Sequence, residues 1–164
     1  MYKFTTFFLM LFTAFNVCAT PWQAKITYDP MDDSKTGFAV YWTAAKESVQ
    51  VACDDTGWRE EFSLYIVIDG YVKKNEISRL EIRIDKEKAF SVDAVPLKTT
   101  HNSLYVTREE EIYKLIQSMK SGKQLHLRTH DWFDKRHYFS VSLLGFTKAL
   151  NEACGWWMDE KGYR

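Results

Sequence analysis

At residues 62–68 the chain reads FSLYIVI, an alternation with the two-residue period of a β-strand. One face of such a strand carries Phe62, Leu64, Ile66 and Ile68. The other face carries Tyr65 and Val67, which can also be covered. Because both faces can be buried, we expect this strand to lie in the middle of a sheet.

The same pattern continues on both sides of this segment. LEIRID, at residues 80–85, sets Leu80, Ile82 and Ile84 against charged neighbours, which is typical of a half-buried strand. Similar alternation predicts further strands at residues 22–28, 38–43, 49–54, 104–106, 124–128 and 138–143. Within residues 49–54, Cys53 shares a face with two valines, so we expect it to point inward.

Two segments switch to the helical period. Residues 107–110 read Thr-Arg-Glu-Glu, a capping box in which Thr107 caps the first turn and Glu110 reaches back. The apolar stripe that follows is formed by Ile112, Leu115, Ile116 and Met119. Gly122 suits the end of this helix. The stripe of a second, short helix is formed by Phe146, Ala149, Leu150 and Ala153.

These elements indicate one mainly β domain. The chain has 164 residues, close to the size of a single domain, and contains no repeat, linker or low-complexity run. Many short strands with few helices predict an antiparallel β-sandwich or barrel-like domain with two short helices. We expect residues 20–164 to form this domain.

The first nineteen residues have the features of a signal peptide. Lys3 gives a short basic start, residues 4–17 carry no charge, and Val17-Cys18-Ala19 fits a signal-peptidase site. We therefore predict cleavage after Ala19, export to the periplasm, and no stable membrane span after cleavage. Two alternatives remain open: a retained membrane anchor, and a lipoprotein acylated at Cys18.

Cleavage would leave two cysteines, Cys53 and Cys154. An even pair in an exported chain predicts a disulfide, which would close a loop of about 100 residues. The alternative is a pair of unlinked buried thiols. A metal site is less favoured, because neither cysteine has another Cys or a His at ligand spacing. The adjacent Trp156 and Trp157 indicate either a binding patch or packing near the disulfide.

The composition argues against several classes of function. Lys and Arg total 22, as do Asp and Glu, so the net charge is zero and nucleic-acid binding is not indicated. The chain has no Gly-rich phosphate loop and no nucleophile elbow, so we predict no cofactor and no enzymatic activity. One enzymatic alternative is a hydrolase pocket built from His126, His130 and Asp131. The two histidines would share a strand face with Arg128, where a solvated polar face is favoured over a metal site.

An acidic turn is the candidate binding site. Residues 29–37 are rich in turn formers, and they hold more carboxylates than a turn needs. Neighbouring carboxylates repel one another unless a cation, an Arg or backbone N–H groups meet them, and Arg83 is the candidate partner. The predicted binding residues are Asp32, Asp33, Ser34, Arg83 and Asp85. The alternative is that this cluster only stabilises the fold.

Taken in order, these features resemble a known family. Trp22 precedes the segment MDDSKT at residues 31–36, and a strand then ends at Cys53. The strand LEIRID follows, and GFTKAL at residues 145–150 leads to Cys154-Gly155-Trp156. This order resembles the VasI/TagO family of type VI secretion system-associated proteins, over nearly all of residues 20–164. Each motif is short, so it is the shared order that carries the resemblance.

The resemblance implies an exported accessory protein that acts through protein–protein interaction at the cell envelope. It carries over no catalytic residue, and the expected partner is an envelope or secretion-system protein. The alternative is an exported inhibitor or immunity-type protein, prophage-encoded ones included, that binds a toxin or an enzyme. Secretion-sheath genes beside this one would favour the first function, and a toxin or lysis gene the second.

Overall fold

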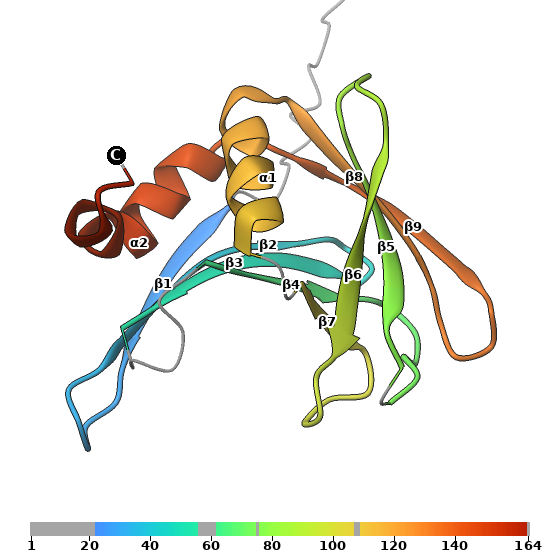
Figure 1. Cartoon of the computed structure of the whole chain (residues 1–164), viewed down its shortest axis with the longest axis horizontal. Helices are drawn as coiled ribbons and strands as arrows, with labels where there is room; N and C mark the ends of the chain where they lie inside the picture. The colour runs from blue at the N-terminus through green and yellow to red at the C-terminus, as the bar shows by residue number, and fades with distance from the viewer. Residues whose placement is uncertain (1–21, 56–61, 75, 107–108, 164) are drawn as a thin grey trace, which may run out of the picture.

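The computed structural model describes residues 22–55, 62–74, 76–106 and 109–163. The signal peptide predicted at residues 1–19, its cleavage site and the Thr107 cap lie outside the described residues. Within them, the chain forms one nine-stranded sheet and two helices (Figure 1).

Every strand of this sheet is antiparallel to its neighbours. The strands are β1 (Gln23–Tyr28), β2 (Lys35–Trp42), β3 (Ser48–Asp54), β4 (Ser63–Val67), β5 (Ser78–Ile84), β6 (Phe90–Pro96), β7 (Ser103–Val106), β8 (Gln124–His130) and β9 (Arg136–Ser142). Across the sheet the order is β1-β2-β3-β4-β7-β6-β5-β8-β9, so β1 and β9 are its edges. β4 pairs with both β3 and β7, which confirms the central position expected from its sequence.

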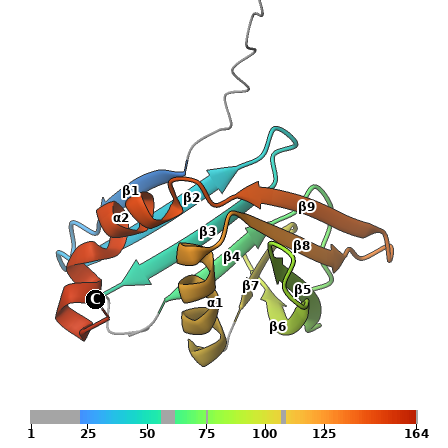
Figure 2. The same cartoon turned by 90° about the horizontal axis from the view of Figure 1, so that it is seen from above.

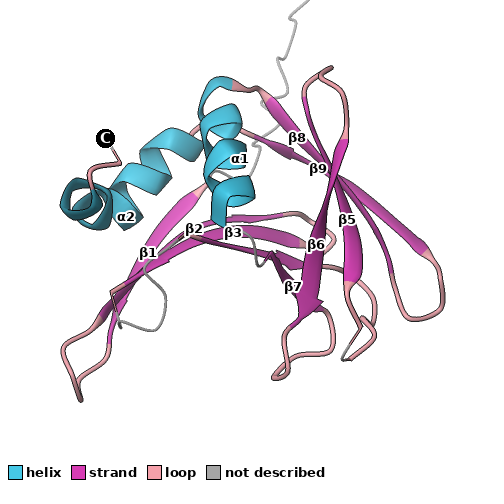
Figure 3. Cartoon of the chain, in the orientation of Figure 1, coloured by secondary structure: helices cyan, strands magenta, loops and turns pink. Residues whose placement is uncertain are grey.

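The sheet curls into a trough that holds both helices. β1 to β4 form one wall, and β5, β6, β8 and β9 form the other (Figures 1 and 2). The helices α1 (Glu109–Ser121) and α2 (Phe146–Lys161) lie on the concave side. The sheet is not closed, but the Trp22 indole Nε1 donates to the Ser142 carbonyl at 2.7 Å and connects the two edges at one end. The predicted mainly antiparallel β domain with two helices is therefore confirmed (Figure 3).

The core lies between the sheet and the helices. The inward residues predicted for β3, β4 and β5 are all buried, as is the predicted stripe of α1. β6 was not predicted, because its inward side chains, Val92 and Ala94, are small and give a weak alternation. α2 continues well beyond the predicted short helix, because Trp157 and Met158 extend its buried stripe past Gly155. Neither helix in the described part of the chain is long and apolar enough to cross a membrane.

A buried disulfide joins the sheet to α2. Cys53 of β3 and Cys154 of α2 form the predicted bond, with Cα atoms 5.8 Å apart. A Cβ at Gly37 of β2 would overlap the Ala153 carbonyl oxygen and lie 2.8 Å from the Cys53 Sγ, so glycine lets α2 approach the sheet here. Trp157 is buried and donates from Nε1 to the Asp54 carbonyl, which confirms packing near the disulfide.

Candidate binding surface

The turn between β8 and β9 displays two aromatic side chains on a hydrogen-bonded frame. The Asp131 carboxylate accepts hydrogen bonds from the backbone N–H groups of Phe133 and Lys135, both at 2.9 Å. The Asp131 N–H donates to the Lys135 carbonyl, and the Asp134 N–H donates to the Asp131 carbonyl. Together these bonds hold the backbone of residues 131–135 in one conformation.

A buried histidine contacts the same carboxylate. His137 Nε2 lies 3.0 Å from the second Asp131 oxygen, and both side chains are only 5% exposed. Burial by itself would raise the pKa of Asp131. Hydrogen bonds from His137, Lys135 and Phe133 outweigh it and lower the pKa below its usual value. The carboxylate is therefore charged near neutral pH, and the frame of the turn is kept.

Three exposed aromatic side chains, Tyr71, Trp132 and Phe133, form what we call the aromatic turn. Their exposed fractions are 63%, 51% and 75%. The Trp132 N–H donates to the Tyr71 carbonyl at 2.6 Å, which joins the β8–β9 turn to the segment that follows β4. Lys73 Nζ lies 5.8 Å from the Trp132 ring centre, within cation–π distance. The aromatic turn borders an open cleft of about 490 Å³ that is also lined by Val72, Lys74 and His101.

A second buried acid, Glu47, lies in the turn between β2 and β3. Its backbone N–H donates to the Thr43 hydroxyl oxygen at 3.2 Å, and the Thr43 hydroxyl lies 3.4 Å from its carboxylate. Burial raises the pKa of Glu47, and the hydrogen bond from Thr43 and the charge interaction with His137 counter it only in part. Ionised Glu47 is therefore less favourable in the fold than in the unfolded chain.

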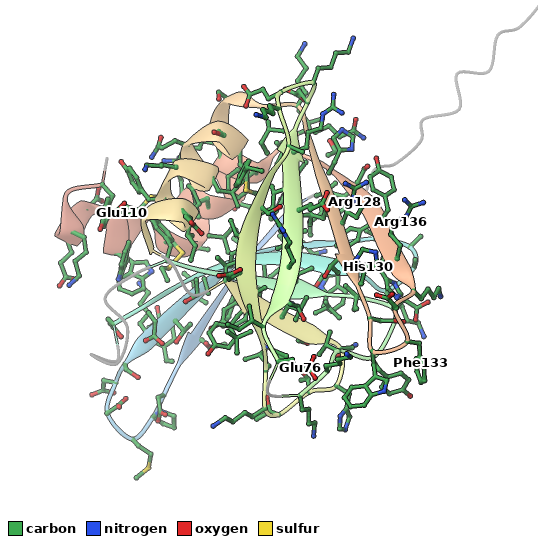
Figure 4. All side chains as sticks on the ribbon, turned by 45° about the vertical axis from the view of Figure 1, so that its right-hand side comes forward. Glu76, Glu110, Arg128, His130, Phe133 and Arg136 are labelled. Atoms are coloured by element: carbon green, nitrogen blue, oxygen red, sulfur yellow. A yellow bond between two sulfur atoms is a disulfide. The ribbon has the colours of Figure 1, made fainter. Side chains whose placement is uncertain are left out.

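The outer face of β5, β8 and β9, opposite the helices, is basic. We call it the basic face, and it carries four arginines and two histidines: Arg79, Arg83, Arg128, Arg136, His126 and His130. The strand register pairs Arg83 with His126 and His130 with Arg136. Figure 4 shows Arg128, His130 and Arg136 along the β8–β9 hairpin, with Phe133 near its tip. The predicted shared face of His126, Arg128 and His130 is confirmed, and it leads to the aromatic turn.

Of the two arginines that border a cavity on the basic face, Arg128 is paired and Arg83 is available. Arg128 Nε donates to Glu81 at 2.8 Å. His126 Nδ1 lies 2.7 Å from the Ser140 hydroxyl, and the His126 ring stacks on Tyr138 with centroids 6.2 Å apart. A cavity of about 190 Å³ is bordered by Glu81, Arg83, His126, Arg128 and Tyr138. Within the described part of the chain, Arg83 makes no hydrogen bond or ion pair, so it can meet an incoming anion.

The acidic turn lies elsewhere, at the end of the β1–β2 hairpin (Figure 1). Asp29 accepts a hydrogen bond from the Met31 N–H at 2.8 Å, and Asp32 accepts one from the Ser34 N–H at 2.9 Å. Hydrogen bonding from the side chain and backbone of Ser34 lowers the pKa of Asp32. Asp33 has a left-handed φ of 61°. Backbone N–H groups of the turn thus meet two of its carboxylates.

Arg83 and Asp85 lie in the opposite wall of the trough, and four strands separate β2 from β5. Asp85 follows the end of β5, where its carboxylate accepts from the N–H groups of Lys123 and Gln124 at 3.1 and 2.8 Å. These hydrogen bonds connect the start of β8 to the end of β5. The structure does not bring Arg83 to the acidic turn, and a binding role for either group stays a prediction.

The three residues of the hydrolase alternative are not gathered in one pocket. His126 borders the cavity of the basic face, whereas His130 and Asp131 border a separate cleft. The Asp131 carboxylate is bound to His137. Among the described residues, no group of three or more His, Cys, Asp or Glu side chains is placed to hold a metal ion.

Neither the aromatic turn nor the Asp131–His137 pair was predicted from the sequence. Two signals were present. Trp132 and Phe133 are adjacent aromatic residues between two aspartates, in a segment that joins two predicted strands. The inward alternation of Phe139 and Val141 also extends back by two residues to His137.

Comparison with known proteins identifies a shared fold. No family model matches the chain, and no curated protein matches it. The structure is similar to the crystal structure of invasion associated protein B from Bartonella henselae, with a TM-score of 0.51 and 12% sequence identity. The match covers 87% of this chain and 96% of that chain. At this identity the similarity shows that the two chains share a fold, and it carries no statement about their roles.

Proposed function

We propose that this protein is exported and acts at the cell envelope by binding another protein. The proposed role is that of an accessory protein, as the sequence resemblance to type VI secretion-associated VasI/TagO proteins implies. The single observation that carries the binding function is the aromatic turn, where three large aromatic side chains lie exposed around an open cleft.

Leaving three large aromatic side chains in water is unfavourable. Grouped exposed aromatic side chains are uncommon on monomeric soluble proteins and mark interaction sites. Tyr and Trp are also enriched among the residues that dominate protein–protein binding energy. The backbone of Trp132 and Phe133 is held by the Asp131 frame, which the buried His137 supports, so little backbone entropy is lost when a partner binds. A partner would cover the apolar surface that the fold leaves in water.

Two further observations support export. The Cys53–Cys154 disulfide is buried, and disulfides of this kind persist mainly in oxidising compartments such as the periplasm. The uncharged segment at residues 4–17 and the site at Val17-Cys18-Ala19 predict cleavage after Ala19. The intact mass of the protein from a periplasmic extract should match residues 20–164. A mass that retains residues 1–19, or one with a lipid on Cys18, would contradict this part of the proposal.

Site-specific photo-crosslinking in intact cells tests the binding function. A photoreactive phenylalanine analogue replaces Phe133 in one variant and Met31, which is 90% exposed, in the control. We expect one discrete crosslinked protein from position 133 and none of the same mass from position 31. Trp132→Ala should weaken that crosslink, because it removes the neighbouring ring. Equal crosslinking from both positions, or none from position 133, would contradict the proposal.

The identity of the crosslinked protein separates the two functions that the sequence left open. A component of a secretion system or of the envelope supports the accessory function. A toxin or a hydrolytic enzyme supports the inhibitor or immunity function instead, and removes the accessory one.

A further inference from the structure

β9 is an edge strand whose outward backbone groups lack a partner among the described strands. The Leu143 N–H donates to the Lys123 carbonyl, so residues 143, 141, 139 and 137 face β8. The Ser142 carbonyl points the other way, because it accepts from the Trp22 indole. By the same alternation, the N–H and C=O groups of Arg136, Tyr138 and Ser140 point to the open edge.

The side chains at these positions lie on the basic face. Arg136 and Tyr138 are exposed there, and the register places them beside His130 and Arg128. Of the outer-face residues of β5, β8 and β9, only Glu81 is acidic, and Arg128 already engages it. Arg83 has no such partner within the described residues. The chain as a whole is neutral, so this concentration of cations is a local feature.

We propose that β9 accepts an extended acidic segment of a partner protein as an added tenth strand. The added strand would hydrogen bond to the outward backbone groups of Arg136, Tyr138 and Ser140. Carboxylates at every second position of that segment would lie over the basic face, and its end could reach the aromatic turn. This inference rests on the proposed function and names the chemistry of the partner.

The geometry of an added strand matches the charges. Side chains two residues apart on a strand lie on one face and are separated by about 6.6 Å. Directly opposite residues on paired strands have Cβ atoms about 4.5–5.5 Å apart, so a carboxylate there meets Arg136. Arg128, one strand further on, stays bonded to Glu81 of β5, so Arg136 is the arginine that faces the added strand. Arginine is suited to this because its planar group binds a carboxylate through two parallel hydrogen bonds.

The other edge of the sheet provides a contrast. The Asp29 N–H donates to the Ser34 carbonyl, so odd-numbered residues of β1 face β2 and the outward groups belong to Ala24, Ile26 and Tyr28. This edge also lacks a strand partner among the described strands, but it ends at the acidic turn. An acidic segment would be repelled there. The two edges therefore offer the same backbone geometry, but only β9 lies beside the basic face, and the β1 edge ends at carboxylates.

Peptide binding tests the proposal. The probe is a fluorescein-labelled peptide of four alternating Thr-Glu pairs, and its control has Lys in place of Glu. Fluorescence anisotropy at 20 and 150 mM NaCl should show binding of the acidic peptide only, weaker at the higher salt. Ser140→Pro removes one outward N–H, which an edge strand tolerates, and should weaken binding at least tenfold. Ser140→Ala keeps the N–H and removes the hydroxyl, and Ile26→Pro alters the other edge; both should bind like the parent protein.

Hydrogen exchange in the unaltered protein gives a measurement that does not depend on a proline variant folding. Saturating acidic peptide should slow amide exchange at Arg136, Tyr138 and Ser140, and should leave Ile26 unchanged. Unchanged exchange at these three residues would overturn strand addition, as would equal binding to Ser140→Pro and Ser140→Ala. Binding of anionic phospholipid vesicles without binding of the peptide would also overturn it. If any of these results is found together with a discrete crosslink from position 133, the strand-addition proposal is wrong. The proposed binding function is then still supported by the crosslink.

Discussion

Loss of the Cys53–Cys154 bond should cost a large part of the stability of this domain. The two cysteines are 101 residues apart in sequence. For a loop of that length, the chain-entropy relation gives about 4.7 kcal/mol at 25 °C for the effect of the crosslink on the unfolded state. Small domains have about 5–15 kcal/mol of stability in total. At about 3 °C per kcal/mol for a domain of this size, the double variant Cys53→Ala/Cys154→Ala should melt about 14 °C lower.

The assay is urea unfolding followed by tryptophan fluorescence, with the oxidised parent protein compared with the double variant. The parent protein reduced with dithiothreitol is the matched control, because it lacks the bond and keeps both sulfur atoms in the core. Reduced parent and double variant should agree within about 1 kcal/mol, which assigns the loss to the crosslink and not to packing. A loss below about 1 kcal/mol in both would refute the reasoning. Full thiol labelling of oxidised, denatured protein would show that the bond is absent.

Three further predictions concern single residues. Asp131→Asn should lower the free energy of unfolding by about 2 kcal/mol at pH 7, because it removes a charged hydrogen-bond acceptor. The pKa of Asp131 is lowered in the fold, so its stabilisation is complete above the ordinary value of 3.8 and is lost as the pH falls through the folded value. In urea unfolding, the free energy of unfolding should therefore differ between parent and variant by a constant amount from pH 7 to 5, and by less below pH 3.8. A difference in this free energy that persists to pH 2 would contradict the assignment. Glu47→Gln should raise the Tm at pH 7 and leave it unchanged at pH 3.5. The reason is that burial raises the pKa of Glu47, so the folded parent protein loses stability as the pH rises above about 4.5. A lower Tm at pH 7 would show that ionised Glu47 is stabilising. Gly37→Ala should cost about 2–3 kcal/mol in urea unfolding, because the added methyl group overlaps the Ala153 carbonyl; an unchanged midpoint would mean that α2 can shift without cost.

The sequence predicted the strands whose alternation is carried by large side chains. Leu64 and Ile66 in β4, and Leu80 and Ile82 in β5, leave no doubt about which face is buried. The disulfide could also be predicted, because export would leave only two cysteines. β6 could not, since Ala94 offers too little apolar surface to mark a face. Local periodicity is thus readable only where the inward residues are large.

The candidate site was harder to predict because it depends on strand order. The sequence suggested that Arg83 binds the carboxylates of the acidic turn. Four strands, β3, β4, β7 and β6, lie between β2, which follows that turn, and β5, which carries Arg83. Asp131 and His137 are six residues apart, and only the bend of the β8–β9 hairpin turns both side chains inward. The basic face likewise needs β5 beside β8, a pairing between strands separated by β6, β7 and α1. Such non-local pairings follow from the whole chain and not from any one segment.

The contacts that complete the trough join segments that are far apart in the sequence. The Trp22 ring packs against the Phe146 ring, with centroids 4.8 Å apart. Cys53 is bonded to Cys154, which is close to the end of the chain. When the chain is made from its N-terminus, the inner surface of β1 to β3 therefore stays uncovered by α2 until the last segment has been made, and we expect the core to close only then. Such a delay would be compatible with the proposed export, in which the chain folds after it has crossed a membrane. It also means that a product truncated before residue 146 would expose the inner faces of its strands, and should be cleared by proteases or aggregate.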